Sequence, residues 1–289
     1  MFPCEKTIGD SREEEHLICP LCWQPRPYGL MTIEHCVPGA VGGNRVTLSC
    51  QECNNNSGVV DNQLSLHQKS ADAAQGHRTM RSMLSFPGTL NVATDFSIDD
   101  GGTRTLHIVD KASNPRHIKA LRQFAEKGEL PSSEFHVTIY DLPNPSFFRL
   151  ALIRSAYLCA FQQFRYAFAG SASGAFLRQL ISRRPIDSRA IELLTGFKVR
   201  IKDWPEAARS FIITPIAFSG ESVIEDRKET FSLMGLFVLI KTAMETSSFH
   251  AVVLPGPGIP PEFFLKALEA LCDEKPATQT VKMKVGAVG

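Results

Sequence analysis

The residues whose spacing predicts a chemistry most directly are four cysteines in two Cys-x-x-Cys pairs, Cys19 with Cys22 and Cys50 with Cys53. Two residues between paired cysteines allow one tight turn to present both sulfurs to one metal, and four thiolates suit a closed tetrahedral Zn²⁺ site. We therefore expect these four cysteines to hold a structural zinc ion. A redox role is less favoured, because thioredoxin-like motifs occur singly and open a helix in a βαβ unit.

Between the two pairs lies Glu34-His35, at the end of the apolar run Leu30–Ile33, and Asn54 follows the last cysteine directly. This order of features resembles the HNH endonuclease family, the ββα-metal nucleases. The resemblance covers roughly residues 17–62. The motifs that carry it are Glu-His-x-x-Pro at 34–38, Gly42-Gly43, and Cys-x-x-Cys-Asn-Asn-x-x-Gly at 50–58.

The resemblance implies metal-dependent hydrolysis of DNA phosphodiester bonds, with His35 as the general base. An imidazole has an unperturbed pKa of about 6.5, which suits proton abstraction near neutral pH. Glu34 and Asn54 are implied as ligands of a catalytic Mg²⁺ or Mn²⁺, which prefer oxygen atoms. Asn44 is implied to hold the loop that orients the base. Adjacent strand residues point to opposite faces, so Glu34 and His35 should lie where the strand ends and the loop begins.

Two positions depart from the family pattern. Gly58 stands where many members carry a third metal-binding histidine, so water would complete the coordination sphere. Asn44 lies ten residues before Asn54, whereas the usual separation is nine. Ordinary explanations stand beside the functional ones, because asparagines favour turns and helix caps, and a single histidine is most often a surface or core residue.

The composition is typical of a soluble globular protein, with 289 residues, of which 43% are hydrophobic and 21% charged. Residues 1–17 carry several charges and do not resemble a signal peptide, and the longest apolar run, Phe231–Ile240, is too short to span a bilayer. We therefore expect a cytoplasmic protein that does not bind a membrane. The net charge is +1, whereas most DNA-binding domains carry a basic excess. A local basic stripe, or a partner protein that supplies targeting, would reconcile this charge with DNA binding.

We predict an α+β fold in which a small zinc-stabilised ββα-metal module precedes a larger mixed α+β domain. The boundaries are a polar lead-in over 1–16, the HNH-like module over 17–84, the larger domain over 85–275 and a tail over 276–289. The expected elements of the larger domain are a hairpin (Gly88–Ile98 and Thr103–Val109), helices at Pro115–Gly128 with Asn114 as N-cap, Pro145–Phe168, Ala175–Arg183 and Glu262–Leu271, and strands at Phe135–Tyr140, Lys198–Ile201, Phe211–Phe218, Phe231–Ile240 and Ala251–Leu254.

Arginines interrupt the apolar sequence of the helix predicted at Pro145–Phe168. Because that helix is apolar almost all round, it should be buried. We therefore expect Arg149, Arg154 and Arg165 to be ion-paired or edge residues rather than nucleic-acid contacts. The most basic stretch runs from Arg183 to Lys202, and we interpret it as a solvated face, with the wall of a DNA groove as the alternative.

Two functions of different classes stay open. The first is an HNH endonuclease that acts on DNA in bacterial defence or a mobile element, with residues 85–275 in targeting or regulation. One such site cuts one strand, so duplex cleavage would need a homodimer or two encounters. The second is a catalytically inactive, zinc-stabilised module that binds nucleic acid or protein. Glu34-His35 discriminates between them, because a purely structural zinc knuckle has no use for this pair at a strand end.

Overall fold

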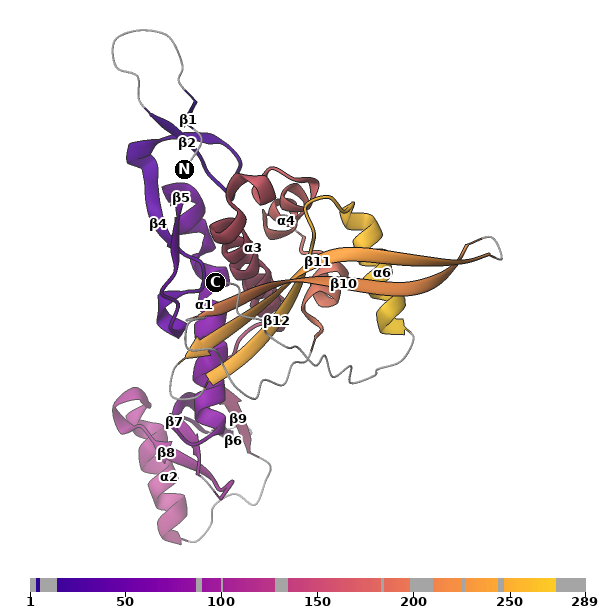
Figure 1. Ribbon diagram of the computed structural model, residues 1–289. Helices are drawn as coiled ribbons and strands as arrows, with labels where there is room; N and C mark the ends of the chain where they lie inside the picture. The colour runs from indigo at the N-terminus through magenta and orange to yellow at the C-terminus, as the bar shows by residue number, and fades with distance from the viewer. Residues whose placement is uncertain are drawn as a thin grey trace. The chain divides into compact units, whose positions relative to one another are not determined.

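The computed structural model describes residues 4–5, 15–86, 90–99, 101–127, 135–182, 185–197, 210–224, 227–243 and 247–273. Within these ranges every strand pairing is antiparallel, and helices accompany the sheets (Figure 1). The predicted α+β class is therefore confirmed. None of the helices in these ranges combines the length and apolar character needed to cross a membrane.

The chain folds as two compact units, and the second is inserted in the sequence of the first. Unit 1 comprises residues 1–64, 145–243 and 247–289, and unit 2 comprises residues 65–144 with 244–246. The limits of these two units differ from the boundary between residues 84 and 85 that we predict from the sequence. The reason is that helix α3, which begins at Pro145, shares one hydrophobic core with residues of the cysteine-bearing segment.

The N-terminal part of unit 1 contains a β-hairpin followed directly by a helix. Strand β4 (Met31–His35) pairs with β5 (Val46–Cys50), and α1 (Gln51–Ala74) begins at the next residue. The part of α1 from Ser65 onward belongs to unit 2. The helix continues through Gly58, where a Cβ atom would meet no neighbour within 4 Å. The remaining elements here are β1 (Cys4–Glu5), β2 (His16–Ile18), β3 (Pro25–Pro27) and the 3₁₀ turns η1 (Tyr28–Leu30) and η2 (Gly39–Val41).

Helix α3 (Pro145–Ala169) forms the centre of unit 1. Every residue from Leu150 to Phe161 is buried, which confirms the burial predicted from its apolar sequence. It packs against β5, against α4 (Ala172–Ser182) and α5 (Ser188–Thr195), and against the C-terminal sheet. The helix is interrupted at Arg165, whose φ is 56°.

The C-terminal part of unit 1 is a three-stranded sheet with helix α6 (Pro261–Asp273). Strands β10 (Phe211–Ile224) and β11 (Arg227–Ala243) form a long ribbon, and β12 (Ser247–Pro255) pairs only with the second half of β11 (Figure 1). Val238, Val252 and Phe264 belong to the same core as α3.

Unit 2 is a small antiparallel sheet packed on one helix. The strand order is β8 (Arg104–Ile108), β7 (Leu90–Ile98), β6 (Met80–Phe86) and β9 (His136–Ile139). Helix α2 (Pro115–Lys127), which follows the turn η3 (Asp110–Ala112), contributes Ile118 and Leu121 to a core with Phe86, Leu90 and Val92. Asn114 caps α2 by accepting a hydrogen bond from the backbone nitrogen of Arg116 at 3.0 Å, as predicted.

Most of the elements predicted beyond residue 85 are confirmed within a few residues, including the hairpin β7–β8 and helices α2, α3, α4 and α6. The predicted strand Lys198–Ile201 lies outside the described residues, as do Arg183, Arg184 and the basic residues from Lys198 to Lys202 in the predicted basic stretch. Helix α5 was not predicted; Asp187 caps it by accepting from the backbone nitrogen of Ala190 at 3.1 Å.

Candidate functional site

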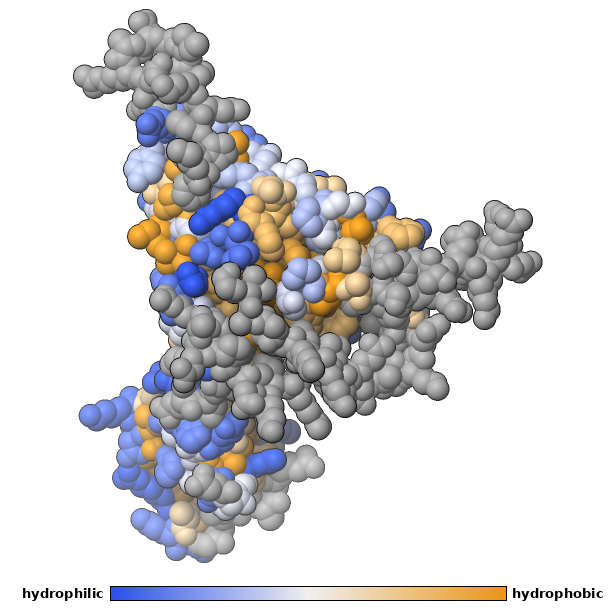
Figure 2. Space-filling model, in the orientation of Figure 1, coloured by the Kyte–Doolittle hydropathy of each residue, from blue (hydrophilic) through white to orange (hydrophobic). Residues whose placement is uncertain are grey.

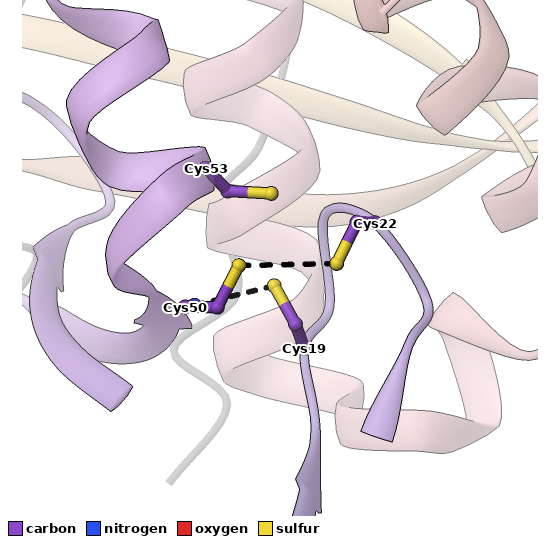
Figure 3. A group of neighbouring side chains, drawn as sticks. All are labelled: Cys19, Cys22, Cys50 and Cys53. Carbon is purple, nitrogen blue, oxygen red and sulfur yellow. Dashed lines mark hydrogen bonds between the residues drawn. The ribbon is translucent and has the colours of Figure 1, made fainter. Parts of the chain in front are cut away.

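Four cysteine side chains converge at the junction of three segments of unit 1. Cys19 and Cys22 lie in the turn after β2, Cys50 ends β5, and Cys53 lies in the first turn of α1 (Figure 3). All four sulfurs lie within 4.8 Å of one another, and Cys22 Sγ is 3.9 Å from Cys50 Sγ. A tetrahedral Zn²⁺ with Zn–S bonds of about 2.3 Å separates its sulfurs by about 3.8 Å. The thiol cluster therefore fits a zinc ion, and the structure brings all four predicted ligands together.

Hydrogen bonds within the cluster favour the thiolate form of Cys19. A hydrogen bond from Cys53, together with backbone N–H groups including that of Cys50, lowers the pKa of Cys19 to about 5. The Cys50 nitrogen lies 3.3 Å from that sulfur. The same hydrogen bond to Cys19, together with burial, raises the pKa of Cys53. A bound metal would take all four groups as thiolates, because only the thiolate is a metal ligand.

Aromatic side chains from α3 hold the first cysteine turn in place. Tyr166 donates its hydroxyl to the Ile18 carbonyl at 2.6 Å, and Tyr157 donates to the Pro20 carbonyl. Trp23, which ends the turn, packs against the Tyr166 ring with 5.9 Å between centroids. The cysteine cluster is consequently fixed to a helix that lies more than a hundred residues further along the chain.

The inner face of the β4–β5 hairpin carries a buried ionic network centred on Arg154 of α3. Its Nη2 atom lies 3.1 Å from Oε1 of Glu34, and its Nη1 atom lies 2.8 Å from Oδ1 of Asp61 on α1. The second carboxylate oxygen of Glu34 accepts a hydrogen bond from Ser49 Oγ at 3.0 Å. Glu34 and Arg154 are almost wholly buried. Burial raises the pKa of Asp61, and the charge of Arg154 offsets part of that increase.

Asn54 lies on the same side of β4 as Glu34. Its amide nitrogen donates to Thr32 Oγ1 at 3.0 Å and to the Ile33 carbonyl at 3.2 Å. Thr32 and Glu34 are two residues apart on a strand and so share a face. The structure thus brings the two residues expected to bind a catalytic cation to one side of the hairpin, while the Glu34 carboxylate is engaged with Arg154.

His35 lies at the exposed end of β4, directly opposite Val46 on β5. Strand alternation places it on the face opposite to Glu34. Its imidazole lies over the turn η2, where a Cβ built on Gly39 would be 3.5 Å from the ring. The predicted pair is therefore at the strand end, as expected, but its two side chains point to opposite faces.

The Gly42-Gly43 motif is required by the loop that follows His35. Gly42 has a φ of 88°, a left-handed conformation that favours glycine. A Cβ at Gly43 would lie 1.7 Å from the Val37 carbonyl oxygen, so no larger residue fits. Asn44, expected to support this loop, accepts a hydrogen bond from Ser210 Oγ at 3.5 Å.

Sequence reasoning did not identify the roles of Arg154, Asp61 and Ser49 in this site. For Arg154 a signal was present, because a charged residue within an apolar helix needs a buried partner, and the expected pairing is confirmed. Arg149, also expected to be paired, lies 3.4 Å from Glu192. Comparison of this chain with known protein families, with curated proteins and with solved structures finds no match.

Proposed function

We propose that this protein is a metal-dependent endonuclease of the HNH type that hydrolyses DNA phosphodiester bonds. The observation that carries the proposal is the position of His35, exposed at the end of β4 in a strand–strand–helix unit whose second strand and helix carry Cys50 and Cys53 of the four-cysteine cluster. An exposed imidazole beside a glycine-rich loop is accessible to a phosphodiester and a water molecule.

In this proposal His35 accepts the proton of the attacking water at an imidazole nitrogen. Asn54 donates from its amide nitrogen to β4, so that its carbonyl oxygen Oδ1 is the atom suited to a cation. Glu34 supplies a carboxylate of the hard-oxygen type that Mg²⁺ and Mn²⁺ prefer. A bound Mg²⁺ or Mn²⁺ would stabilise charge on the leaving 3′ oxygen.

Glu34 can bind a cation only if it shares its carboxylate with Arg154 or gives up that ion pair. An ionised carboxylate has about four acceptor sites, of which Ser49 uses one on Oε2, while Arg154 contacts Oε1 as an ion pair. Arg154 would keep its two contacts to Asp61 after such a change. The oxygen atoms of Glu34 and Asn54 therefore suit a divalent cation, which would compete with the Arg154 guanidinium for the Glu34 carboxylate.

Incubation of the purified protein with supercoiled plasmid tests the proposal. We expect relaxed circles to form with added Mg²⁺ or Mn²⁺ and not without them. Linear product would arise from a homodimer or from two successive encounters, and its dependence on protein concentration separates the two. Intact plasmid under every metal condition, with zinc bound to the protein, would contradict the proposal.

The second candidate is a catalytically inactive zinc-stabilised module that binds nucleic acid or a protein partner. The observation in its favour is that Arg154 already neutralises Glu34 from inside the protein, on the face opposite to His35. Mn²⁺ binding, followed by electron paramagnetic resonance, separates the candidates. The nuclease should bind Mn²⁺ at a site that is lost in Glu34→Gln, whereas the inactive module should bind none there.

A further inference from the structure

The β4–β5 hairpin presents its apolar face outward and its polar face inward. Glu34, Thr47 and Ser49 on the inner face are each at most 5% exposed, whereas Ile33 and Val46 on the outer face are 65% and 45% exposed. An antiparallel sheet with one solvated face normally does the reverse. Figure 2 shows hydrophobic side chains gathered at the surface over β4. Such an exposed patch usually marks a binding surface.

Alternation places Met31, Ile33 and His35 of β4 on the outer face, opposite Cys50, Leu48 and Val46 of β5. Because Cys50 is buried in the cysteine cluster, we define the outer face by the other five residues. His35 is therefore surrounded by apolar neighbours, since Ile33 lies two residues before it and Val46 lies opposite it.

Two further features extend this surface toward the start of β4. The turn η1, which leads directly into the strand, carries Tyr28 and Leu30 with 61% and 48% of their surface exposed. From Tyr28 to Cys50 the charged residues are Glu34, which is buried in its ion pair, and Arg45, which is exposed. The exposed charge of this segment is therefore positive.

We propose that the outer face, together with Tyr28 and Leu30, binds unpaired bases of single-stranded nucleic acid beside His35. Exposed aromatic and aliphatic side chains provide surfaces on which bases stack, and a cationic side chain contacts the phosphates. A perfect duplex hides its base faces, so it cannot use such a surface. This inference rests on the proposed function for the role of His35, and it names an unpaired or opened strand as the substrate.

A second copy of the chain fits this surface less well. In a two-fold interface the same patch meets itself, so the exposed charges brought together from Tyr28–Cys50 would have one sign. A nucleic acid strand supplies both the apolar base faces and the negative charge that the surface lacks.

Fluorescence anisotropy with a labelled oligothymidylate, alone and annealed to its complement, tests this inference. The protein carries His35→Ala and its bound zinc, and no Mg²⁺ or Mn²⁺ is added, so binding is measured apart from cleavage. We expect the single strand to bind at least about 10-fold more tightly than the duplex. Tyr28→Ala and Ile33→Ser should each weaken single-strand binding by about 10-fold or more, and Tyr28→Phe should retain it.

Ile108→Ser is the matched control, because Ile108 is also exposed on a strand, but in unit 2. Equal binding of single strand and duplex, or equal losses in Ile33→Ser and Ile108→Ser, would overturn the inference. It would also fail if the protein were a dimer by analytical ultracentrifugation that Ile33→Ser converts to monomer without affecting oligonucleotide binding. Plasmid cleavage without single-strand preference would reject this inference alone, and single-strand binding without cleavage would reject the nuclease alone.

Discussion

Nη2 of Arg154 lies 3.1 Å from Oε1 of Glu34, and both side chains are at most 5% exposed. Arg154 comes from the core helix α3, whereas Glu34 immediately precedes the candidate general base. With Asp61 on the other side of the guanidinium, one buried cation joins β4, α1 and α3. The position of the hairpin therefore depends on a residue far from it in the sequence.

Replacement of Arg154 by methionine should strongly destabilise unit 1, because it leaves two carboxylates in the interior without their cation. Removal of one partner from a buried pair typically costs about 3–5 kcal/mol. Arg149→Met is the matched control, since Arg149 pairs with Glu192 at the surface, where such a pair is worth about 0–1 kcal/mol. Urea unfolding measures both free energies, and equal losses would show that the buried network does not stabilise the fold.

The four-cysteine cluster should bind one Zn²⁺ per chain. Cys19→Ser should release this zinc and expose the N-terminal segment to protease, because the free energy of zinc binding contributes directly to folding. Cys159→Ala is the control, since Cys159 is a buried cysteine of α3 that does not belong to the cluster. Elemental analysis measures the zinc content, and limited proteolysis measures the protection of the N-terminal segment. Full protease resistance of zinc-free Cys19→Ser would contradict a structural role for the metal.

His35→Ala should reduce plasmid cleavage by about 10²- to 10⁴-fold, the usual loss for a general base. Zinc content should be unchanged, because the substitution lies at an exposed strand end away from the cysteines. His107→Ala, which changes an exposed histidine of unit 2, should cut at the wild-type rate. Wild-type cleavage by His35→Ala would remove the basis of the HNH assignment.

Asn54→Ala should weaken the response of cleavage to Mg²⁺, with partial recovery in Mn²⁺, which binds oxygen and nitrogen sites more tightly. Glu34→Gln should lose activity in both metals, because it removes the charge while keeping a side chain of similar shape beside Ser49. Titration of each metal against cleavage rate measures the difference. Wild-type metal dependence in both variants would show that neither Glu34 nor Asn54 binds the catalytic cation.

Burial lowers the pKa of His67 on α1, which gives stability a specific dependence on pH. In the unfolded chain His67 binds a proton below about pH 6.5, whereas the folded protein takes it up only at lower pH. The contribution of neutral His67 to the free energy of unfolding is therefore fully present above about pH 6.5 and is lost as the pH falls. The drop in melting temperature between about pH 7.5 and pH 5.5 should be smaller in His67→Gln. An identical drop would show that His67 does not titrate with unfolding.

The spacing of residues was sufficient to predict those parts of the fold that depend on neighbouring positions. The Cys-x-x-Cys pairs predicted the metal cluster, and the all-apolar sequence of α3 predicted its burial, because each is a property of a single local segment. The cap of α2 at Asn114 was predictable for the same reason.

The features that were not predicted depend on contacts between distant segments. No local pattern links Arg154 to Glu34 and Asp61, and the division of the chain follows from the shared core of α3 with the N-terminal segment. Helix α5 is short and amphipathic, and its identity is decided by packing against α3 and α6. The segment that forms β4 was interpreted as the end of an apolar run, whereas its Glu34 is buried because it pairs with Arg154.

The insertion of unit 2 into the sequence of unit 1 affects the order of events during synthesis. Cys53 leaves the ribosome roughly 100 residues before Arg154 and the tyrosines of α3, a delay of about 5–20 s at common translation rates. During this interval the thiols can already take up a metal ion, but the carboxylates of Glu34 and Asp61 have no cation to pair with. Nascent chains stopped before residue 145 should therefore bind zinc, yet remain sensitive to protease until α3 emerges.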